Sequence, residues 1–189
     1  MSARYACALT LALVPLAAGG WEPVLAEHVS APKKHAFTVQ LPPGWLVDVG
    51  KQALMASRDG PSLGAIGVEL FAHKDAFRGA KKQSRDGEPP EDLAEAYLAE
   101  VQSSGVLNVE VVSKGPVQLA GRPAFRLQVR YRSPAEFGVE FEEVALGTTA
   151  PEGFLVARYR APRVHFFEKN LPDFEAVLPS LALTPAASK

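Results

Sequence analysis

Apolar and polar residues alternate along much of the chain. In residues 37–41, Phe37, Val39 and Leu41 occupy every second position, which is the pattern of a strand with one buried face. Turn-forming residues rich in proline and glycine separate this segment from further strand-like segments. The first half of the chain is therefore expected to form an antiparallel meander with strands at residues 37–41, 45–49, 54–57 and 65–71.

The second half repeats this alternation over longer stretches, with proline- and glycine-containing turns between them. The segment 154–159 is apolar on both sides, which is typical of a central strand covered on both faces. Lys114-Gly115-Pro116 is expected to end one strand, and Ala150-Pro151-Glu152-Gly153 is expected to form a tight turn. Strands are predicted at residues 107–111, 117–119, 125–131, 140–146 and 154–160.

Two segments show a helical period instead. In Glu91–Ser104, Leu93, Tyr97 and Val101 recur every four residues, which predicts an amphipathic helix. Residues 164–178 fit a second helix that is broken near Pro172 or whose last turns begin at that proline. Because the helices are separated by sheet and do not alternate strictly with strands, the predicted fold class is α+β. We expect an antiparallel β-sheet sandwiched by helices, an α/β/α arrangement.

Residues 75–88 show no sustained period. Loops of this length inside a domain are often functional or disordered. We interpret this segment as a mobile loop, with disorder favoured over a functional role.

The N-terminal segment has the features of an export signal. An apolar run from Ala6 to Ala18 follows Arg4. It is shorter than the roughly 20 residues of a membrane-spanning helix but fits the roughly 7 to 15 residues of a signal-peptide core. Val24-Leu25-Ala26 offers small residues at a cleavage site. We therefore predict a secretory signal peptide over residues 1–26, cleaved after Ala26 or alternatively after Ala18, and a single domain over residues 27–189.

Cys7 is the only cysteine and lies inside this apolar run. The predicted mature chain therefore has no thiol for a disulfide, a nucleophile or a metal ligand. A thiol-free chain is compatible with an oxidising compartment. A periplasmic or extracellular location is the expectation.

Charge and motifs exclude several function classes. The chain has 20 Lys and Arg against 21 Asp and Glu, so it has no overall positive field to attract nucleic acid. It contains no Gly-x-Ser-x-Gly nucleophile elbow, dinucleotide fingerprint or phosphate-binding loop. Its four histidines lack the spacing of a metal site. We expect no catalytic residue, no cofactor and no metal, and therefore not an enzyme.

The opening strand and its ending carry a family resemblance. Phe37-Thr38-Val39-Gln40-Leu41 followed by Pro42-Pro43-Gly44-Trp45, together with the order of the later elements, resembles the PsbP/Mog1-like superfamily, in particular bacterial secreted PsbP-like (DUF1795-type) proteins. The resemblance implies an antiparallel sheet between helices. It also implies an accessory role, mostly outside the cytoplasm or in the thylakoid lumen, with a nuclear-transport branch, and it implies no catalytic residue.

Charged residues on the later strands have two interpretations. Alternation places Glu140 and Glu142 on one strand face and Glu143 on the other. Opposite the arginines of the neighbouring strand, these glutamates are expected to form cross-strand ion pairs, worth about 0 to 1 kcal/mol each when exposed. A general acid and base pair is the less favoured reading. The functional alternative is a positively charged docking face made by Arg126, Arg130, Arg132, Arg158 and Arg160.

The sequence leaves two function hypotheses. The leading one is a non-enzymatic secreted or periplasmic accessory protein that docks on another protein or envelope complex through its sheet edge and charged strands. The alternative is a small-molecule or lipid-binding module with a pocket between the terminal helix and the sheet. The residues expected to line that pocket are Trp45, Phe166, Phe167 and Phe174.

Overall fold

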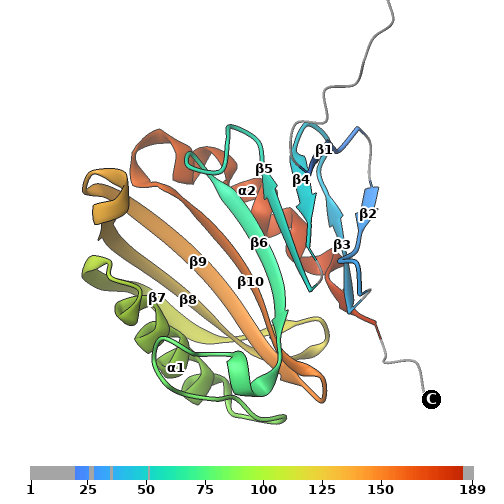
Figure 1. Ribbon diagram of the computed structural model, residues 1–189, viewed down its shortest axis with the longest axis vertical. Helices are drawn as coiled ribbons and strands as arrows, with labels where there is room; N and C mark the ends of the chain where they lie inside the picture. Colours follow the sequence, from blue (N-terminus) through green and yellow to red (C-terminus); the bar gives the residue numbers. More distant parts are fainter. Residues whose placement is uncertain (1–19, 26–27, 35, 51, 185–189) are drawn as a thin grey trace, which may run out of the picture.

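A twisted antiparallel sheet forms the centre of the protein (Figure 1). The computed structural model describes residues 20–184 apart from 26–27, 35 and 51. Within these residues the sheet has eight strands in the order β1-β4-β5-β6-β10-β9-β8-β7. The strands are β1 (Trp21–Pro23), β4 (Leu46–Val49), β5 (Ala53–Ser57), β6 (Ala65–Phe71), β7 (Leu107–Leu119), β8 (Arg122–Ser133), β9 (Val139–Ala150) and β10 (Gly153–Pro162).

The opening strand belongs to a separate small sheet. β3 (Phe37–Leu41) pairs with β2 (His28–Ser30) on one side and with β11 (Ala182–Leu183) on the other. The alternation predicted for β3 is correct, because Phe37, Val39 and Leu41 are buried. The predicted meander is correct for β4, β5 and β6 but wrong for β3, which pairs with the end of the chain. Local periodicity does not encode such a distant pairing.

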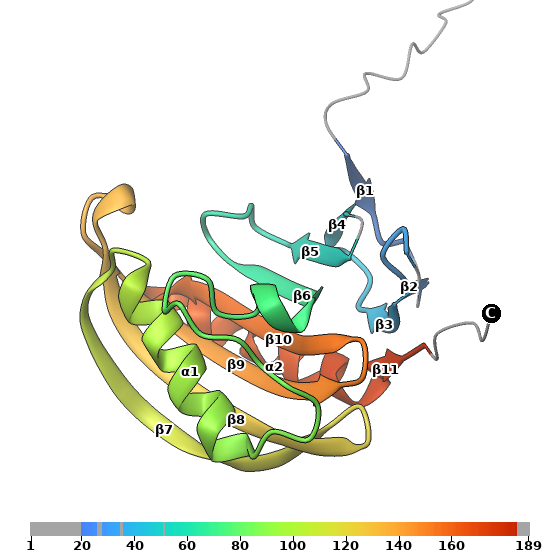
Figure 2. The same cartoon turned by 60° about the horizontal axis from the view of Figure 1, so that its bottom comes forward.

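Helices cover both faces of the large sheet (Figure 2). α1 (Pro90–Ser103) lies over β8 and β9 on one face, and α2 (Glu168–Val177) lies on the other. We refer to these as the α1 face and the α2 face. Each face has its own apolar core, one centred on Leu93 and Phe125 and the other on Trp45 and Phe174. The α+β class and the sandwich of sheet between helices are thus confirmed.

β10 is a central strand, as its composition predicted. It pairs with β6 on one side and with β9 on the other. Phe154 and Val156 contribute to the core on the α1 face, whereas Leu155 and Ala157 contribute to the core on the α2 face. A strand buried on both faces needs apolar residues at both odd and even positions, which is the pattern observed.

β7 is one continuous edge strand where two strands were predicted. Lys114-Gly115-Pro116 does not end it, because Gly115 and Pro116 pair with Arg126 and Phe125 of β8. A proline is tolerated on an edge strand, where its missing N–H can face away from the partner strand. Register shifts between Leu107 and Glu110 and between Val111 and Ser113 interrupt the pairing. Such irregularities discourage the addition of a further strand at an exposed edge.

The loop over residues 75–88 is anchored at several points, contrary to the expectation of a mobile loop. The Phe77 side chain is fully buried and its ring lies 4.8 Å from that of Phe154. The carboxylate of Glu100 on α1 accepts hydrogen bonds from the backbone N–H groups of Gly79 and Ala80, at 3.1 and 2.8 Å. A loop held by one aromatic side chain and a few backbone hydrogen bonds has no periodic pattern of apolar residues. Its order therefore could not be predicted from the sequence.

The break in the terminal helical segment lies earlier than predicted. Val164 and His165 leave the helical conformation, and His165 has a φ of 72°. α2 then continues through Pro172, whose side chain is exposed. The remaining short helical segments are η1 (His73–Asp75), η2 (Pro134–Glu136), η3 (Arg163–Phe167) and η4 (Leu178–Ser180).

Residues 1–19 of the predicted export signal and its cleavage site after Ala26 lie outside the described residues. The described part of that segment, β1, pairs with β4, and Val24 is buried. Among the described residues, no helix is long and apolar enough to span a membrane.

Candidate functional site

The five arginines of the predicted docking face lie on opposite sides of the sheet. Paired residues of antiparallel strands share a face. Arg126 and Arg130 pair with Leu146 and Glu142 of β9, which places them, and Arg132 two residues further on, on the α2 face. Arg158 and Arg160 pair with Ala145 and Glu143, which places these two on the α1 face. The structure therefore brings the arginines together in two groups and not in one surface.

The α2 face contains the predicted cross-strand ion pairing. Arg130 donates a hydrogen bond to the carboxylate of Glu142 at 3.0 Å, and this hydrogen bond raises the pKa of Arg130. Arg126 pairs with Glu175 of α2 at 2.9 Å. Glu140 pairs with Arg163 at 2.7 Å, and this hydrogen bond lowers the pKa of Glu140. The remaining arginine of the group, at position 132, is exposed and forms no ion pair with another described residue.

Glu143 is the central polar residue of the α1 face. As alternation predicted, it points away from Glu140 and Glu142. Glu143 is only 4% exposed. Its two carboxylate oxygens accept hydrogen bonds from the hydroxyls of Tyr97, at 2.6 Å, and Tyr131, at 2.8 Å. Burial, followed by the neighbouring Glu143 charge, raises the pKa of both tyrosines. Both phenols therefore stay protonated and remain hydrogen-bond donors.

A groove of about 600 Å³ lies beside this glutamate. We call it the α1 groove. Its walls come from the C-terminal half of α1 and from the turn between β5 and β6, and its floor includes Glu143, Arg158 and Arg160. Gly67 contributes to the floor next to Arg158, whose side chain would lie 3.4 Å from a Cβ atom at that position. Arg160 lies over the Phe141 ring at 3.9 Å and pairs with Glu136 at 2.7 Å.

The aromatic residues expected to line a ligand pocket fill the core instead. Trp45, Phe167 and Phe174 are buried, and Phe166 is partly buried against the same core. The rings of Phe167 and Phe174 pack on Tyr159 at centroid distances of 5.6 and 5.9 Å. The indole N–H of Trp45 donates to Asp173 of α2 at 3.0 Å. These four side chains hold α2 on the sheet. They line neither the α1 groove nor the cavity between the terminal segment and the sheet.

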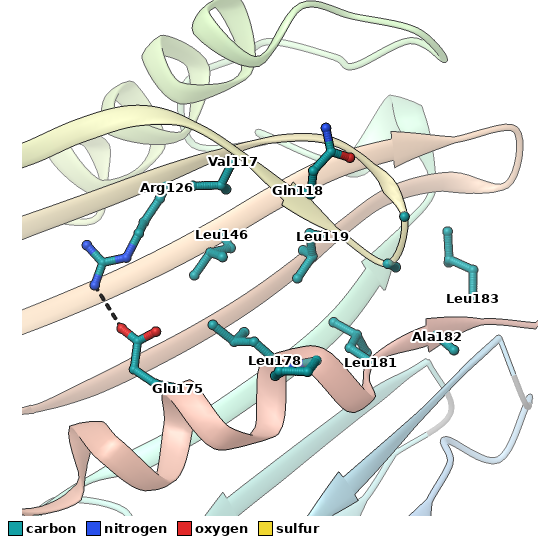
Figure 3. Close-up of a pocket in the computed structure, with 13 residues that line it drawn as sticks. Val117, Gln118, Leu119, Arg126, Leu146, Glu175, Leu178, Leu181, Ala182 and Leu183 are labelled. Carbon is teal, nitrogen blue, oxygen red and sulfur yellow. Dashed lines mark hydrogen bonds and ion pairs between the residues drawn. The ribbon is translucent and has the colours of Figure 1, made fainter.

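A different cavity does lie between the terminal segment and the sheet (Figure 3). We call it the terminal cavity; its volume is about 540 Å³. Figure 3 shows Leu119 and Leu146 of the sheet facing Leu178 and Leu181 across it, with the Arg126–Glu175 pair at one end. It is apolar along most of its length and charged at that end.

A third feature is the end of the sheet where β8 turns into β9. Phe137 is fully exposed there, at 101%. Its φ of 56° is in the left-handed region, which bulky residues rarely adopt. Backbone hydrogen bonds from Phe137 to Pro134 and from Gly138 to Ser133 close this turn. We call the surface formed by the following exposed residues the β8–β9 end: Leu107, Arg132, Phe137, Val139 and Val164.

The strand register places these residues at the same end of the sheet, with Leu107 and Arg132 on the α2 face and Val139 on the α1 face. Leu107 pairs with Arg132, and Val139 pairs with Ser133, the next residue of β8. The Arg163–Glu140 ion pair holds the residue before Val164 against the residue after Val139. Among the described residues, no group of three potential metal-ligating side chains is found.

Comparison with known proteins shows the fold. No protein family profile and no curated protein matches the sequence. Among solved structures, cyanobacterial PsbP (CyanoP) from Synechocystis sp. PCC 6803 is similar over 90% of this chain and 100% of its own, with a TM-score of 0.54 and 15% identity. The Saccharomyces cerevisiae Ran-binding protein Mog1p is similar over 82% of this chain and 94% of its own, with a TM-score of 0.56 and 10% identity.

The protein has a PsbP/Mog1-like fold. This agrees with the resemblance carried by the Pro42-Pro43-Gly44-Trp45 opener. A Pseudomonas aeruginosa protein of unknown function, PA94, is also similar to this chain, with a TM-score of 0.50 and 12% identity over 85% of this chain and 99% of its own. At these identities the likeness concerns the fold alone, so the candidate sites rest on the residues of this chain.

Sequence reasoning missed the partners of Glu143. Alternation along each strand allows Tyr131 of β8 and Glu143 of β9 to point to the same face of the sheet, but it does not show that the two side chains meet. The helical period of α1 marks Tyr97 as buried but does not say which strand residue it meets. The exposed Phe137 was also missed, although the Phe137-Gly138 pair after Ser133-Pro134 is a turn signal that could have located it.

Proposed function

We propose that this is a non-enzymatic accessory protein that binds another protein through the β8–β9 end. The observation that carries this proposal is Phe137, whose apolar ring is held fully in solvent by a closed, left-handed turn. Leaving such a side chain exposed forgoes about 1.5 to 3 kcal/mol of burial free energy. Backbone strain at an exposed bulky residue is a feature that often marks a functional site.

The surroundings of Phe137 suit a protein partner. Leu107 and Val164 add exposed apolar surface, and Arg132 adds a positive charge without an ion pair among the described residues. An exposed aromatic residue beside apolar and arginine side chains has the composition of an interface centre. The edge strand β7 is less suited to docking by strand addition, because of its two register shifts. We therefore place the docking surface at the β8–β9 end and not along the strand edge.

The fold supports a binding role in general terms, since one protein with this fold, Mog1p, is described as Ran-binding. The apolar N-terminal run supports export, and we propose a periplasmic or extracellular location with a partner in the cell envelope. Fractionation of cells that express the full chain tests this location. Recovery of the protein in the cytoplasmic fraction alone contradicts it.

Site-specific photo-crosslinking tests the docking surface. A benzophenone side chain at position 137, in the source organism, is expected to crosslink a discrete partner protein. The matched control is position 152 in the exposed turn at the opposite end of β9. Arg132→Glu and Leu107→Ser should weaken the crosslink at 137. Equal crosslinking at both positions, or a crosslink at 137 that both substitutions leave unchanged, contradicts the proposal.

A second candidate function rests on the terminal cavity. Its leucine-rich walls fit an acyl chain, and its volume is in the range of ligand pockets. A fluorescent fatty acid titrated into the protein tests this function. Saturable binding that Leu146→Trp abolishes supports it, because a larger side chain there fills the cavity. The control is Val112→Trp, on the exposed edge strand. Equal binding by the two variants contradicts this function.

A further inference from the structure

The α1 groove has an imbalance between hydrogen-bond acceptors and donors. Three carboxylates line it, and both oxygens of each accept a hydrogen bond from the protein. Those of Glu143 bind the two tyrosine hydroxyls, those of Glu100 bind two backbone N–H groups, and those of Glu136 bind Arg160 and Ser133. The carboxylate oxygens of the groove are thus already engaged.

Donors remain available on the floor of the groove. Arg158 is exposed to the groove and forms no ion pair with any described residue. The Nε–H of Arg160 also has no hydrogen-bond partner, but it is buried and not accessible to a ligand, so Arg158 supplies the available donors. A guanidinium presents several N–H donors in a planar fork that matches a carboxylate. Unpaired N–H donors at the floor of a groove favour a ligand that has acceptor oxygens.

We propose that the α1 groove binds a small carboxylic acid, with its carboxylate on Arg158 and its apolar body along the groove walls. Met55, Ala65, Val101 and Val106 provide apolar wall surface. The volume of about 600 Å³ is sufficient for a ligand of this kind. This site shares no lining residue with the terminal cavity or with the β8–β9 end, although Ser133, Ala135 and Glu136 place it next to the turn that carries Phe137.

The charges around Arg158 favour a monoanion. Besides the Tyr97 hydroxyl, Glu143 and Glu69 act on this arginine, and neither carboxylate forms an ion pair with it. Because these two carboxylates together outweigh the single positive charge of Arg158, the net repulsion is about twice as large for a dianion as for a monoanion. The other arginine of the floor, Arg160, is already compensated by Glu136. A carboxylate therefore fits better than a phosphate dianion.

Ligand titration tests the proposal with named probes. The probes are hexanoate, octanoate and 3-phenylpropionate, with 3-phenylpropan-1-ol as the neutral counterpart and phenyl phosphate as the dianion. Binding is measured by calorimetry and by shifts of backbone amide NMR signals. At least one carboxylate is expected to bind saturably with a Kd below about 1 mM. Its neutral counterpart should not compete, and the shifted amides should lie along the groove.

Two variants locate the binding. Arg158→Gln should weaken the carboxylate at least about tenfold, because it removes the charge that the ligand needs. Gly67→Leu keeps Arg158 but fills the floor beside it, and should weaken binding similarly; the φ of Gly67 is not in the left-handed region, so a side chain is allowed. Arg85→Gln, at an exposed loop position that lines neither the α1 groove nor the terminal cavity, is the matched control and should bind like the unaltered protein.

Three outcomes overturn the proposal. The first is that none of the carboxylates binds the unaltered protein saturably. The second is that Arg158→Gln and Gly67→Leu both bind as tightly as the control; if one of them fails to fold, the other decides. The third is that phenyl phosphate binds more tightly than every carboxylate, which would assign the groove to a phosphate group.

Discussion

The hydroxyl of Tyr97 lies 2.6 Å from a carboxylate oxygen of Glu143, so a residue of α1 is hydrogen-bonded to a buried charge on β9. The hydroxyls of Tyr97 and Tyr131 supply hydrogen bonds in place of those that this carboxylate would form with water if it were exposed. The contact fixes α1 above the sheet at the border of the α1 groove. Stability and the shape of the groove are therefore linked at this residue.

Tyr97→Phe should lower the free energy of unfolding by about 1 to 3 kcal/mol. The substitution keeps the ring but leaves one oxygen of a buried carboxylate without its donor. Urea unfolding followed by circular dichroism measures the change. Tyr159→Phe is a useful comparison, because its hydroxyl donates to a backbone carbonyl, that of Phe166, and not to a charge. A larger loss for Tyr159→Phe than for Tyr97→Phe would contradict the role assigned to the Glu143 charge.

Phe77→Ala should destabilise the protein by about 3 to 5 kcal/mol, the usual cost of truncating a fully buried phenylalanine. Its ring packs on Phe154 and ties the loop over residues 75–88 to the core. Hydrogen exchange should become faster in this loop before it does so in β8 or β9. Unchanged exchange across the loop would mean that other contacts hold it.

Phe137→Asn should raise the free energy of unfolding by about 0.5 to 1 kcal/mol while weakening the binding of the partner protein at the β8–β9 end. Asparagine tolerates the left-handed conformation better than phenylalanine does, and it exposes less apolar surface. Thermal unfolding of the two proteins side by side measures the gain. A loss of stability would show that the exposed ring contributes to the fold.

Acid should weaken the contact between Asp59 and α2. Hydrogen bonds from Lys169, first, and from Asn170 lower the pKa of Asp59 below its ordinary value of 3.8. A carboxyl group with a lowered folded-state pKa contributes stability above its unfolded pKa and loses it as the pH falls through the folded pKa. Asp59→Asn should therefore cost about 1 kcal/mol near pH 6 and progressively less below about pH 4.

The control for the acid experiment is Glu152→Gln, in an exposed turn and without an ion pair among the described residues. Urea midpoints measured between about pH 2.5 and 7 compare the two variants with the unaltered protein. A constant effect of Asp59→Asn over that whole range would contradict the assignment.

The two predicted cleavage sites differ in their consequence for β1. A chain that starts at residue 19 keeps Trp21–Pro23 on β4 and keeps Val24 buried, whereas a chain that starts at residue 27 loses both. The shorter chain should be less stable by about 2 kcal/mol, roughly the burial free energy of one valine. Comparison of both chains by urea unfolding tests this. Equal stability would mean that β1 adds nothing to the sheet.

Much of the fold could be predicted because it depends on local patterns. Alternation along β10 identified a central strand, and the four-residue period of Leu93, Tyr97 and Val101 identified α1. The pairing of β3 with β11 could not be predicted, because residues 140 or more positions apart meet there. The continuity of β7 was missed because its edge position tolerates a proline.

The candidate sites were harder to predict than the fold. Alternation correctly separated Glu142 from Glu143, but the arginines were grouped by residue type and not by face. The groove depends on how far α1 extends over the sheet, which follows from tertiary packing. A single exposed side chain such as Phe137 is recognised only when the surrounding turn is known.

The covering of the sheet on both faces has a further consequence for variation of this protein. Glu142 and Glu143 are neighbours in the chain, yet each contacts a different helix-covered layer. The Arg130–Glu142 contact and the Tyr97–Glu143 contact have no residue in common and lie on opposite faces, so the effects of substituting Arg130 and Tyr97 should add. Substitutions on one face of the sheet, natural or engineered, can therefore change what that face binds without requiring substitutions on the other face.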